Sequence, residues 1–495
     1  MFANIAIKER SPLNVQHYRA RTEKIPHLDE LSRLLASAVA DDVSAHEVEQ
    51  GLWKHMLSLG RQALQVFFTH CGSGDEGDTV KLDDGRTVKR LPELHTRRYL
   101  TVFGEFSLPR FVYGSREGQK IDYIPLDTRL QLPAQKFSCL LQDWNQSMAT
   151  ELPFGKVDKH LSRLLSFQQS VDSLEKSNRL LAGHVGDFWK QVAQPAADEE
   201  GELMVVTADG KGVVMCSGEL EATAQEKAKS SGRPGNKKMA LIGAAYTVDA
   251  YPRTPEQVLA ALFSDLRRVD DESLPTRPKP LYKRVRGALL RNEQGKTDPQ
   301  SDAIFSWLAD EVKQRGLPTG KTLVLIMDGQ ESLWNSGVRH LPGEQFQVVE
   351  ILDLIHATQY AWTATHLFYT KGSPEATRHA REQISRLLNS QVNQVIEDWR
   401  EKAEQEPFSV SDHEKLEKVC GYFTNHAHRM RYKDYLEKGL PVASGVIEGA
   451  CRNVVKDRME HSGMHWTMKG ANAMLELRSI QLSGLWDEFM QDWRE

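Results

Sequence analysis

The chain has 495 residues, of which 40% are hydrophobic and 26% charged, and its formal net charge is −5. These values are typical of an ordinary soluble protein with room for two to four domains. Its apolar runs are far shorter than the roughly 20 residues that a membrane helix needs, so no membrane span is predicted. The N-terminal residues lack a secretion signal pattern, which predicts a cytoplasmic protein. The five cysteines show no CxxC spacing, which argues against a disulfide framework and against a zinc site.

The N-terminal part is predicted to combine helices with a small β element. Apolar residues at helix spacing predict a helical module over residues 1–75. Short alternating strands with Asp-Gly turns follow between 79 and 126. Two helices with a polar break near 166–170 complete the region 76–193; they suit either a DNA-binding helix-turn-helix or an ordinary helical hairpin. The side chains that the second helix of a helix-turn-helix would offer to DNA are Ser173, Lys176, Ser177 and Arg179.

The rest of the chain alternates strand and helix patterns after a linker-like stretch at 194–201. In residues 202–372, LMVVTADG, KKMALIGAAYTVDAY and KTLVLIMDG are typical of strands, and SDAIFSWLADEVKQRG is typical of an amphipathic helix. This order predicts an α/β sheet. A highly charged helical insertion is predicted over 373–438, followed by a C-terminal helical region over 439–495.

Three acidic residues stand out in this part. Asp209 and Asp328 each follow an apolar strand and precede a glycine. The carboxyl ends of strands in an open α/β sheet face the functional crevice, so both side chains can point into one site; each Asp-Gly pair is also compatible with a plain turn. Glu448 lies in a helix-like stretch of small residues, either at the surface or as the third ligand of a metal held with both aspartates.

Carboxylates in this number fit phosphodiester chemistry. Two magnesium ions about 3.5–4 Å apart can activate an attacking oxygen and stabilise the leaving oxyanion. Magnesium prefers hard oxygen ligands, and clustered carboxylates repel one another unless a cation is present. A cluster of three such carboxylates would therefore anticipate a metal ion.

Four stretches in this order, ADGKG, LIMDG, ILDLIHATQY and SGVIEGACRNVVKDRME, resemble the DDE transposases of bacterial insertion sequences, specifically the ISKra group. The resemblance covers residues 204–482. It implies an RNase H-like α/β catalytic domain with a helical insertion, preceded by a mainly helical region with a small β element. It also implies that Asp209, Asp328 and Glu448 bind two Mg²⁺ ions, with Mn²⁺ as a substitute.

The same resemblance implies a function and partners. The protein would bind the terminal inverted repeats of its mobile element, hydrolyse double-stranded DNA and transfer the freed strand to target DNA. It would be nucleoid-associated when bound to DNA. At least a dimer is implied, because two element ends must be paired.

Asp353 and His356 form a D-x-x-H pair, which related transposases also place shortly after the second aspartate. At this spacing both side chains lie on similar faces, where they would order DNA near the cut or support a metal ligand. A core histidine bonded to a nearby acid is the alternative. The pair is predicted to be auxiliary.

Basic residues cluster in two stretches, 227–238 and 279–296, although the net charge is negative. Such stretches either contact phosphates or form solvated surface. Two tryptophans are predicted to stack on a base near the cut, with plain packing as the alternative. A third basic group recurs at helix spacing after Glu448. The residues predicted to contact DNA are Lys227, Lys229, Arg233, Lys237, Lys238, Arg284, Arg286, Trp334, Arg452, Lys456, Arg458 and Trp466.

Two other functions remain open from the residues alone. A DNA-binding protein descended from a transposase would retain the three acids without turnover. An RNase H-like structure-selective nuclease would share every catalytic residue but would not transfer strands. Inverted repeats flanking the gene would favour the transposase.

Overall fold

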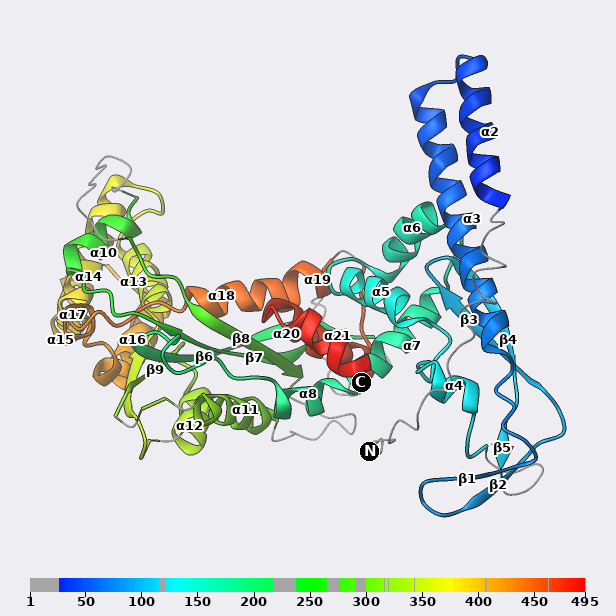
Figure 1. Cartoon of the computed structure of the whole chain (residues 1–495). Helices are drawn as coiled ribbons and strands as arrows, with labels where there is room; N and C mark the ends of the chain where they lie inside the picture. The colour runs from blue at the N-terminus through cyan, green and yellow to red at the C-terminus, as the bar shows by residue number, and fades with distance from the viewer. Residues whose placement is uncertain are drawn as a thin grey trace. The chain divides into compact units, whose positions relative to one another are not determined.

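The computed structural model describes residues 26–114, 121–216, 237–264, 276–289, 300–315, 317–318, 320–341, 343–405, 407–461 and 463–494. Its contacts divide the chain into two compact units, with the boundary between Ser177 and Asn178. These are called the N-terminal and the C-terminal unit below (Figure 1). Among the residues that the structure describes, no helix has both the length and the apolar character to cross a membrane.

The N-terminal unit begins with the predicted helical module, which consists of α2 (Pro26–Ala40) and α3 (Ala45–Cys71). A capping box formed by Ser44 and Glu47 starts α3 and satisfies two otherwise unpaired N–H groups. The predicted small β element follows as a hairpin and a separate three-stranded sheet. Its strands are β1 (Thr79–Lys81), β2 (Thr87–Arg90), β3 (His95–Thr101), β4 (Gly104–Arg110) and β5 (Tyr113–Gly114).

The two helices with a polar break are also present. They are α6 (Phe154–Leu165) and α7 (Val171–Ala182), and α6 ends at Ser166 in a left-handed conformation with φ of 60°. Ser177 on α7 is 2% exposed and its hydroxyl bonds to Gln142, so this side chain faces the protein interior and not DNA. The remaining helices of the unit are α4 (Pro125–Arg129) and α5 (Cys139–Glu151).

The C-terminal unit is built on a mixed five-stranded sheet, as expected for the predicted α/β class. The strand order is β10-β9-β6-β7-β8. The middle strand β6 pairs antiparallel with β7 and parallel with β9; β8 is antiparallel to β7, and β10 is parallel to β9. The bounds are β6 (Leu203–Val214), β7 (Lys237–Val248), β8 (Leu281–Leu289), β9 (Thr322–Met327) and β10 (Gln347–Leu352).

Helices cover both faces of this sheet (Figure 1). A Cβ placed on Gly243 of β7 would meet Ile304 of α11 (Gln300–Gln314) at 2.8 Å, so α11 packs tightly on one face. A Cβ on Gly287 of β8 would meet Val454 at 3.3 Å, which places the C-terminal helices on the opposite face. Those helices are α18 (Gly445–Cys451), the π-helix η4 (Arg452–Lys456), α19 (Asp457–Met459) and α20 (Met468–Leu482).

Helices occupy the segment predicted as an insertion. They are α14 (Pro374–Leu388), α15 (Val392–Gln405), α16 (Val410–His426), the 3-10 helix η3 (Ala427–Arg429) and α17 (Tyr432–Glu437). The insertion follows α13 (Leu354–Phe368), which continues directly from β10. The other helices of the unit are α8 (Val185–Gln191), α10 (Pro255–Leu262), α12 (Glu331–His340) and α21 (Trp486–Arg494).

Residues 194–201 are not a free linker, contrary to the prediction. Glu200 in this stretch belongs to a network of buried ion pairs. Glu200 accepts from the guanidinium of Arg315 at 3.2 Å, and Arg315 also binds Glu311 at 3.0 Å. Glu311 in turn pairs with Arg284 at 3.0 Å. These four residues, the buried Arg–Glu network, tie the predicted linker to β8 and α11.

Candidate metal centre

Three aspartates follow the ends of the parallel strand pairs. The strands β6 and β9 pair in parallel up to Ala208 and Met327, and β9 and β10 pair up to Met327 and Leu352. These three residues are therefore side by side at one edge of the sheet. The next residue along each chain segment is an aspartate: Asp209, Asp328 and Asp353.

The strand that carries Asp209 does not end there, contrary to the prediction. β6 runs on to Val214 because its antiparallel partner β7 continues beside it; only the parallel pairing with β9 ends at Ala208. Asp209 lies directly opposite Ile242 in the antiparallel pair. Its Oδ2 lies 3.5 Å from Sγ of Cys451 in α18, so the carboxylate faces the helix that carries Glu448.

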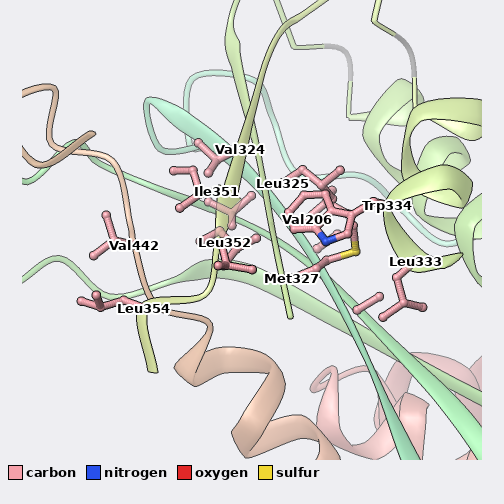
Figure 2. Packing of buried hydrophobic residues seen from close by; sticks show 14 of the residues in the cluster. Val206, Val324, Leu325, Met327, Leu333, Trp334, Ile351, Leu352, Leu354 and Val442 are labelled. Carbon is pink, nitrogen blue, oxygen red and sulfur yellow. The ribbon is translucent and has the colours of Figure 1, made fainter. Parts of the chain in front are cut away.

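Asp328 is held at the start of a short loop by its backbone and side chain. Its carbonyl oxygen accepts a hydrogen bond from Nε1 of Trp334 at 2.7 Å, and its Oδ1 accepts from the N–H of Gln330 at 2.9 Å. Trp334 is 1% exposed and belongs to the same core cluster as Met327 (Figure 2). Burial raises the pKa of Asp328, and the negative charge of Asp209 raises it further.

Glu448 lies on α18 and completes a second group of potential ligands. Single ligand atoms of Asp353, His356 and Glu448 all lie within 4.8 Å of one another. Partial burial raises the pKa of Glu448, and the charge of Asp353 adds to the effect. The pKa of His356 is raised chiefly by its interaction with Asp353, whose Oδ2 lies 3.6 Å from Nδ1. Negative charge is thus concentrated at this edge of the sheet.

The predicted acids and the auxiliary pair therefore gather in one region. The charge of Asp209 acts on the carboxyl groups of both Asp328 and Glu448. The donor set is three carboxylates with Asp353 and His356 adjacent, and carboxylate oxygens are the ligands that magnesium prefers. Burial and neighbouring negative charge raise the pKa of both Asp328 and Glu448, and a bound cation would relieve that cost. The residues present thus fit a divalent metal ion.

Three of the predicted DNA contacts are buried in the protein, and a fourth, Arg286, is partly buried in an ion pair. Arg284 is 5% exposed within the buried Arg–Glu network, and Arg286 pairs with Glu476 at 2.9 Å. Trp334 holds the Asp328 backbone, and Trp466 is 9% exposed with Nε1 donating to a carbonyl oxygen. Internal pairing and packing, rather than DNA contact, account for these side chains.

The other predicted basic contacts divide into four groups. Lys227, Lys229 and Arg233 lie outside the described residues. Arg458 is 1% exposed and stacks over Trp466 at 5.1 Å, which gives it a packing role. Lys237 pairs with Glu460 at 3.1 Å, and Lys238 lies 3.4 Å from the sulfur of Met468. The exposed basic residues beyond Glu448 on the same helical segment are Lys456 and Arg452, and Arg452 pairs with Asp457 at 3.5 Å.

No local sequence pattern indicates a contact between the insertion and the Asp328 loop. A Cβ added to Gly329 would lie 2.1 Å from the ring of Tyr422 on α16. Glycine is therefore required here by the close approach of an aromatic ring. The ring of Tyr422 is itself stacked on Tyr360 of α13, at a centroid distance of 3.8 Å. Insertion helix α16 thus packs directly against the residue after Asp328.

This close packing predicts the effect of Gly329→Ala. The added methyl group must displace Tyr422 or the Asp328 loop, and overpacking of this kind costs about 1–3 kcal/mol. We expect a corresponding loss of stability in chemical denaturation. The matched control is Gly421→Ala, at the residue before Tyr422 on α16, where no atom lies within 4 Å of an added Cβ. Equal stability of the two variants would contradict the described contact.

The raised pKa of Asp328 predicts how metal-free protein responds to pH. An acid whose pKa is raised by folding binds its proton more tightly in the folded state. Stability therefore falls as pH rises through the range between the unfolded and the folded pKa, and the loss is complete above it. Metal-free Asp328→Asn should accordingly melt at a higher temperature than the wild type at pH 7, and no higher at a pH below both values.

Thermal melting with and without Mg²⁺ provides the measurement. We expect Mg²⁺ to raise the melting temperature of the wild type and to have much less effect on Asp328→Asn, since a ligand stabilises only the state that binds it. Each kcal/mol gained when a cation relieves the buried charge of Asp328 raises the melting temperature of a unit as large as the C-terminal unit by at most about 2–4 °C. A variant that is less stable than the wild type without metal at pH 7 would refute the repulsion.

Comparisons with known proteins give little further information. No protein-family model matches the chain, and no curated protein matches it. Among solved structures, the chain resembles one described as the Drosophila P element transposase strand transfer complex. That structure is 10% identical in sequence, the match covers 73% of this chain and 83% of that chain, and the TM-score is 0.25.

Proposed function

We propose that the chain is a DDE transposase of the kind found in bacterial insertion sequences, with an RNase H-like catalytic domain. The observation that carries the proposal is the alignment of Asp209 and Asp328 on adjacent parallel strands, beside the helix that bears Glu448. A mixed sheet of this kind is compatible with the RNase H-like fold. The proposed metal ligands are Asp209, Asp328 and Glu448, for two Mg²⁺ ions or Mn²⁺ in their place.

The ligands differ in how firmly they are held, which suits a site that must admit DNA. Asp328 is fixed by two hydrogen bonds, and Asp209 by the strands on either side of it. Glu448 is exposed and lies on a short helix. When bound, the metal ions would supply activation of the attacking oxygen and stabilisation of the leaving oxyanion. His356, half-buried beside Glu448, would order the DNA near the cut.

DNA would approach from the side of Glu448. Arg452 and Lys456 are exposed on the next turns of the same helical segment, where they would contact phosphates beside the metal ions. The α6–α7 helices of the N-terminal unit are proposed to bind the terminal inverted repeats. At least a dimer would pair the two element ends.

The test uses labelled duplex DNA that carries the inverted repeats flanking the gene, with a plasmid as target. We expect Mg²⁺-dependent cleavage at the repeat end and joining of a pre-cut end with a free 3′ hydroxyl to the plasmid, both abolished by EDTA. Cleavage of DNA without any joining would favour the structure-selective nuclease. Binding to the repeats without either reaction would favour the DNA-binding protein without turnover.

A further inference from the structure

Asp353 connects the two chain segments that carry proposed metal ligands. Its backbone N–H donates to the carbonyl oxygen of Met327, the residue before Asp328, at 2.9 Å. Its side chain is fully buried, with 0% exposure. A buried carboxylate needs hydrogen-bond donors around it, because an unpaired buried charge is very costly. The donors that surround it therefore define what this residue does.

Three protein groups donate to this carboxylate. One oxygen, Oδ1, accepts from the N–H of Ile355 at 2.7 Å and so caps α13. The other, Oδ2, accepts from both the N–H and the hydroxyl of Ser444, the N–H at 3.2 Å. A carboxylate has about four acceptor sites, and three are used by these groups. His356 lies 3.6 Å from the same Oδ2, so little acceptor capacity remains for a metal ion.

The Ser444 side chain bonds to Asp353 instead of capping its own helix. It is the residue before α18, where a serine side chain ordinarily accepts a hydrogen bond from its own helix. Its side chain makes no such cap, and its hydroxyl donates to Asp353 instead. The backbone supports the same attachment, because the N–H of Leu354 donates to the carbonyl oxygen of Val442 at 2.9 Å. Figure 2 shows Leu354 and Val442 together beside the end of β10.

We infer that Asp353 and Ser444 form a clamp that positions Glu448 at the acidic edge of the sheet, and that Asp353 is a positioning residue rather than a metal ligand. The chain between them is long, since α13 and the helical insertion separate the two residues. The contact between Asp353 and Ser444 attaches the start of α18 to the edge of the sheet after the insertion, one turn before Glu448. The positioning role rests on the proposed function, whereas the attachment of α18 does not.

Hydrogen exchange of metal-free protein tests the attachment without any catalysis. Ser444→Ala removes the hydroxyl and leaves one buried acceptor with fewer partners, so the amides of α18 should exchange about tenfold faster or more. Asp353→Asn should have the same effect, because an amide cannot accept at every site that the carboxylate uses. Ser373→Ala is the matched control: it removes the hydroxyl that caps α14 in the insertion and should leave exchange in α18 unchanged. Wild-type exchange in α18 of Ser444→Ala would overturn the clamp.

The Mg²⁺ dependence of DNA cleavage tests the positioning role. Misplacement of one ligand weakens metal binding, and loss of a supporting partner typically lowers metal affinity about 10–100-fold. We expect Ser444→Ala to need correspondingly more Mg²⁺ for half-maximal cleavage, with much of the rate restored at saturating Mg²⁺. A lower maximal rate at an unchanged Mg²⁺ requirement would overturn the positioning role. Absence of metal-dependent cleavage by the wild type would reject the proposed function, and the exchange result would then still decide the clamp.

Discussion

Replacement of Asp328 by asparagine is expected to reduce Mg²⁺-dependent DNA cleavage by about 10³-fold or more. The amide keeps the shape of the side chain but removes the charge that would hold the metal ions between β6 and β9. Metal ions supply several kcal/mol of charge stabilisation in the transition state, and about 4 kcal/mol corresponds to a factor of 10³ in rate. The measurement is the single-turnover cleavage rate of labelled DNA at saturating Mg²⁺.

The control for this substitution is Asp434→Asn, which makes the same chemical change at an exposed position on α17. We expect wild-type cleavage from the control variant and unchanged DNA binding by both variants. Binding should persist because Asp328 contributes no positive charge to the phosphate contacts. A cleavage rate for Asp328→Asn equal to that of the control would remove Asp328 from the catalytic site.

The largest effect on stability is expected from Glu311→Ala. Glu311 is 2% exposed and bonds to both Arg284 and Arg315, which are themselves buried. Its removal leaves Arg284 without its carboxylate partner and leaves Glu200 as the remaining carboxylate partner of Arg315. Breaking a buried pair by removing one partner costs about 3–5 kcal/mol, because the remaining charge stays buried. Chemical denaturation should show this loss in the transition of the C-terminal unit.

The matched control is Glu382→Ala. Glu382 and Arg386 form an ion pair with the same i,i+4 spacing as Glu311 and Arg315, but the Glu382 side chain is 56% exposed. Exposed pairs of this spacing contribute only about 0.3–0.5 kcal/mol. Similar losses for the two variants would show that the Arg–Glu network is not buried as described.

Local sequence patterns predicted the position of Asp328 in the fold, because a single strand carried the signal. An apolar strand followed by Asp328 placed that residue at the edge of the sheet, because the core demands apolar side chains up to Met327. The same reasoning ended β6 too early. The antiparallel pairing with β7, which extends β6 past Asp209, depends on a partner strand and is not encoded in β6 alone.

Charge along the sequence was a poor guide to which basic side chains are exposed. The stretch around Arg284 and Arg286 was interpreted as a basic surface, but it forms strand β8. Arg284 can be buried because Glu311 on α11 and Gln194 accept hydrogen bonds from its guanidinium. No local sequence pattern predicts partners so distant along the chain. The alternation of Val285, Gly287 and Leu289 was the signal that could have revealed a strand. The contact between Asp353 and Ser444 lies equally beyond local patterns, since the whole insertion separates them.

The most direct test of the central claim is a crystal structure with Mn²⁺, which reveals metal ions by their anomalous scattering. The account predicts anomalous peaks at the edge of the sheet, bound by oxygen atoms of Asp209, Asp328 and Glu448. Asp353 should remain bonded to Ser444 and make no direct bond to the ion. Absence of any peak at this edge, with all three acids in the described positions, would contradict the metal centre and the cleavage chemistry that depends on it.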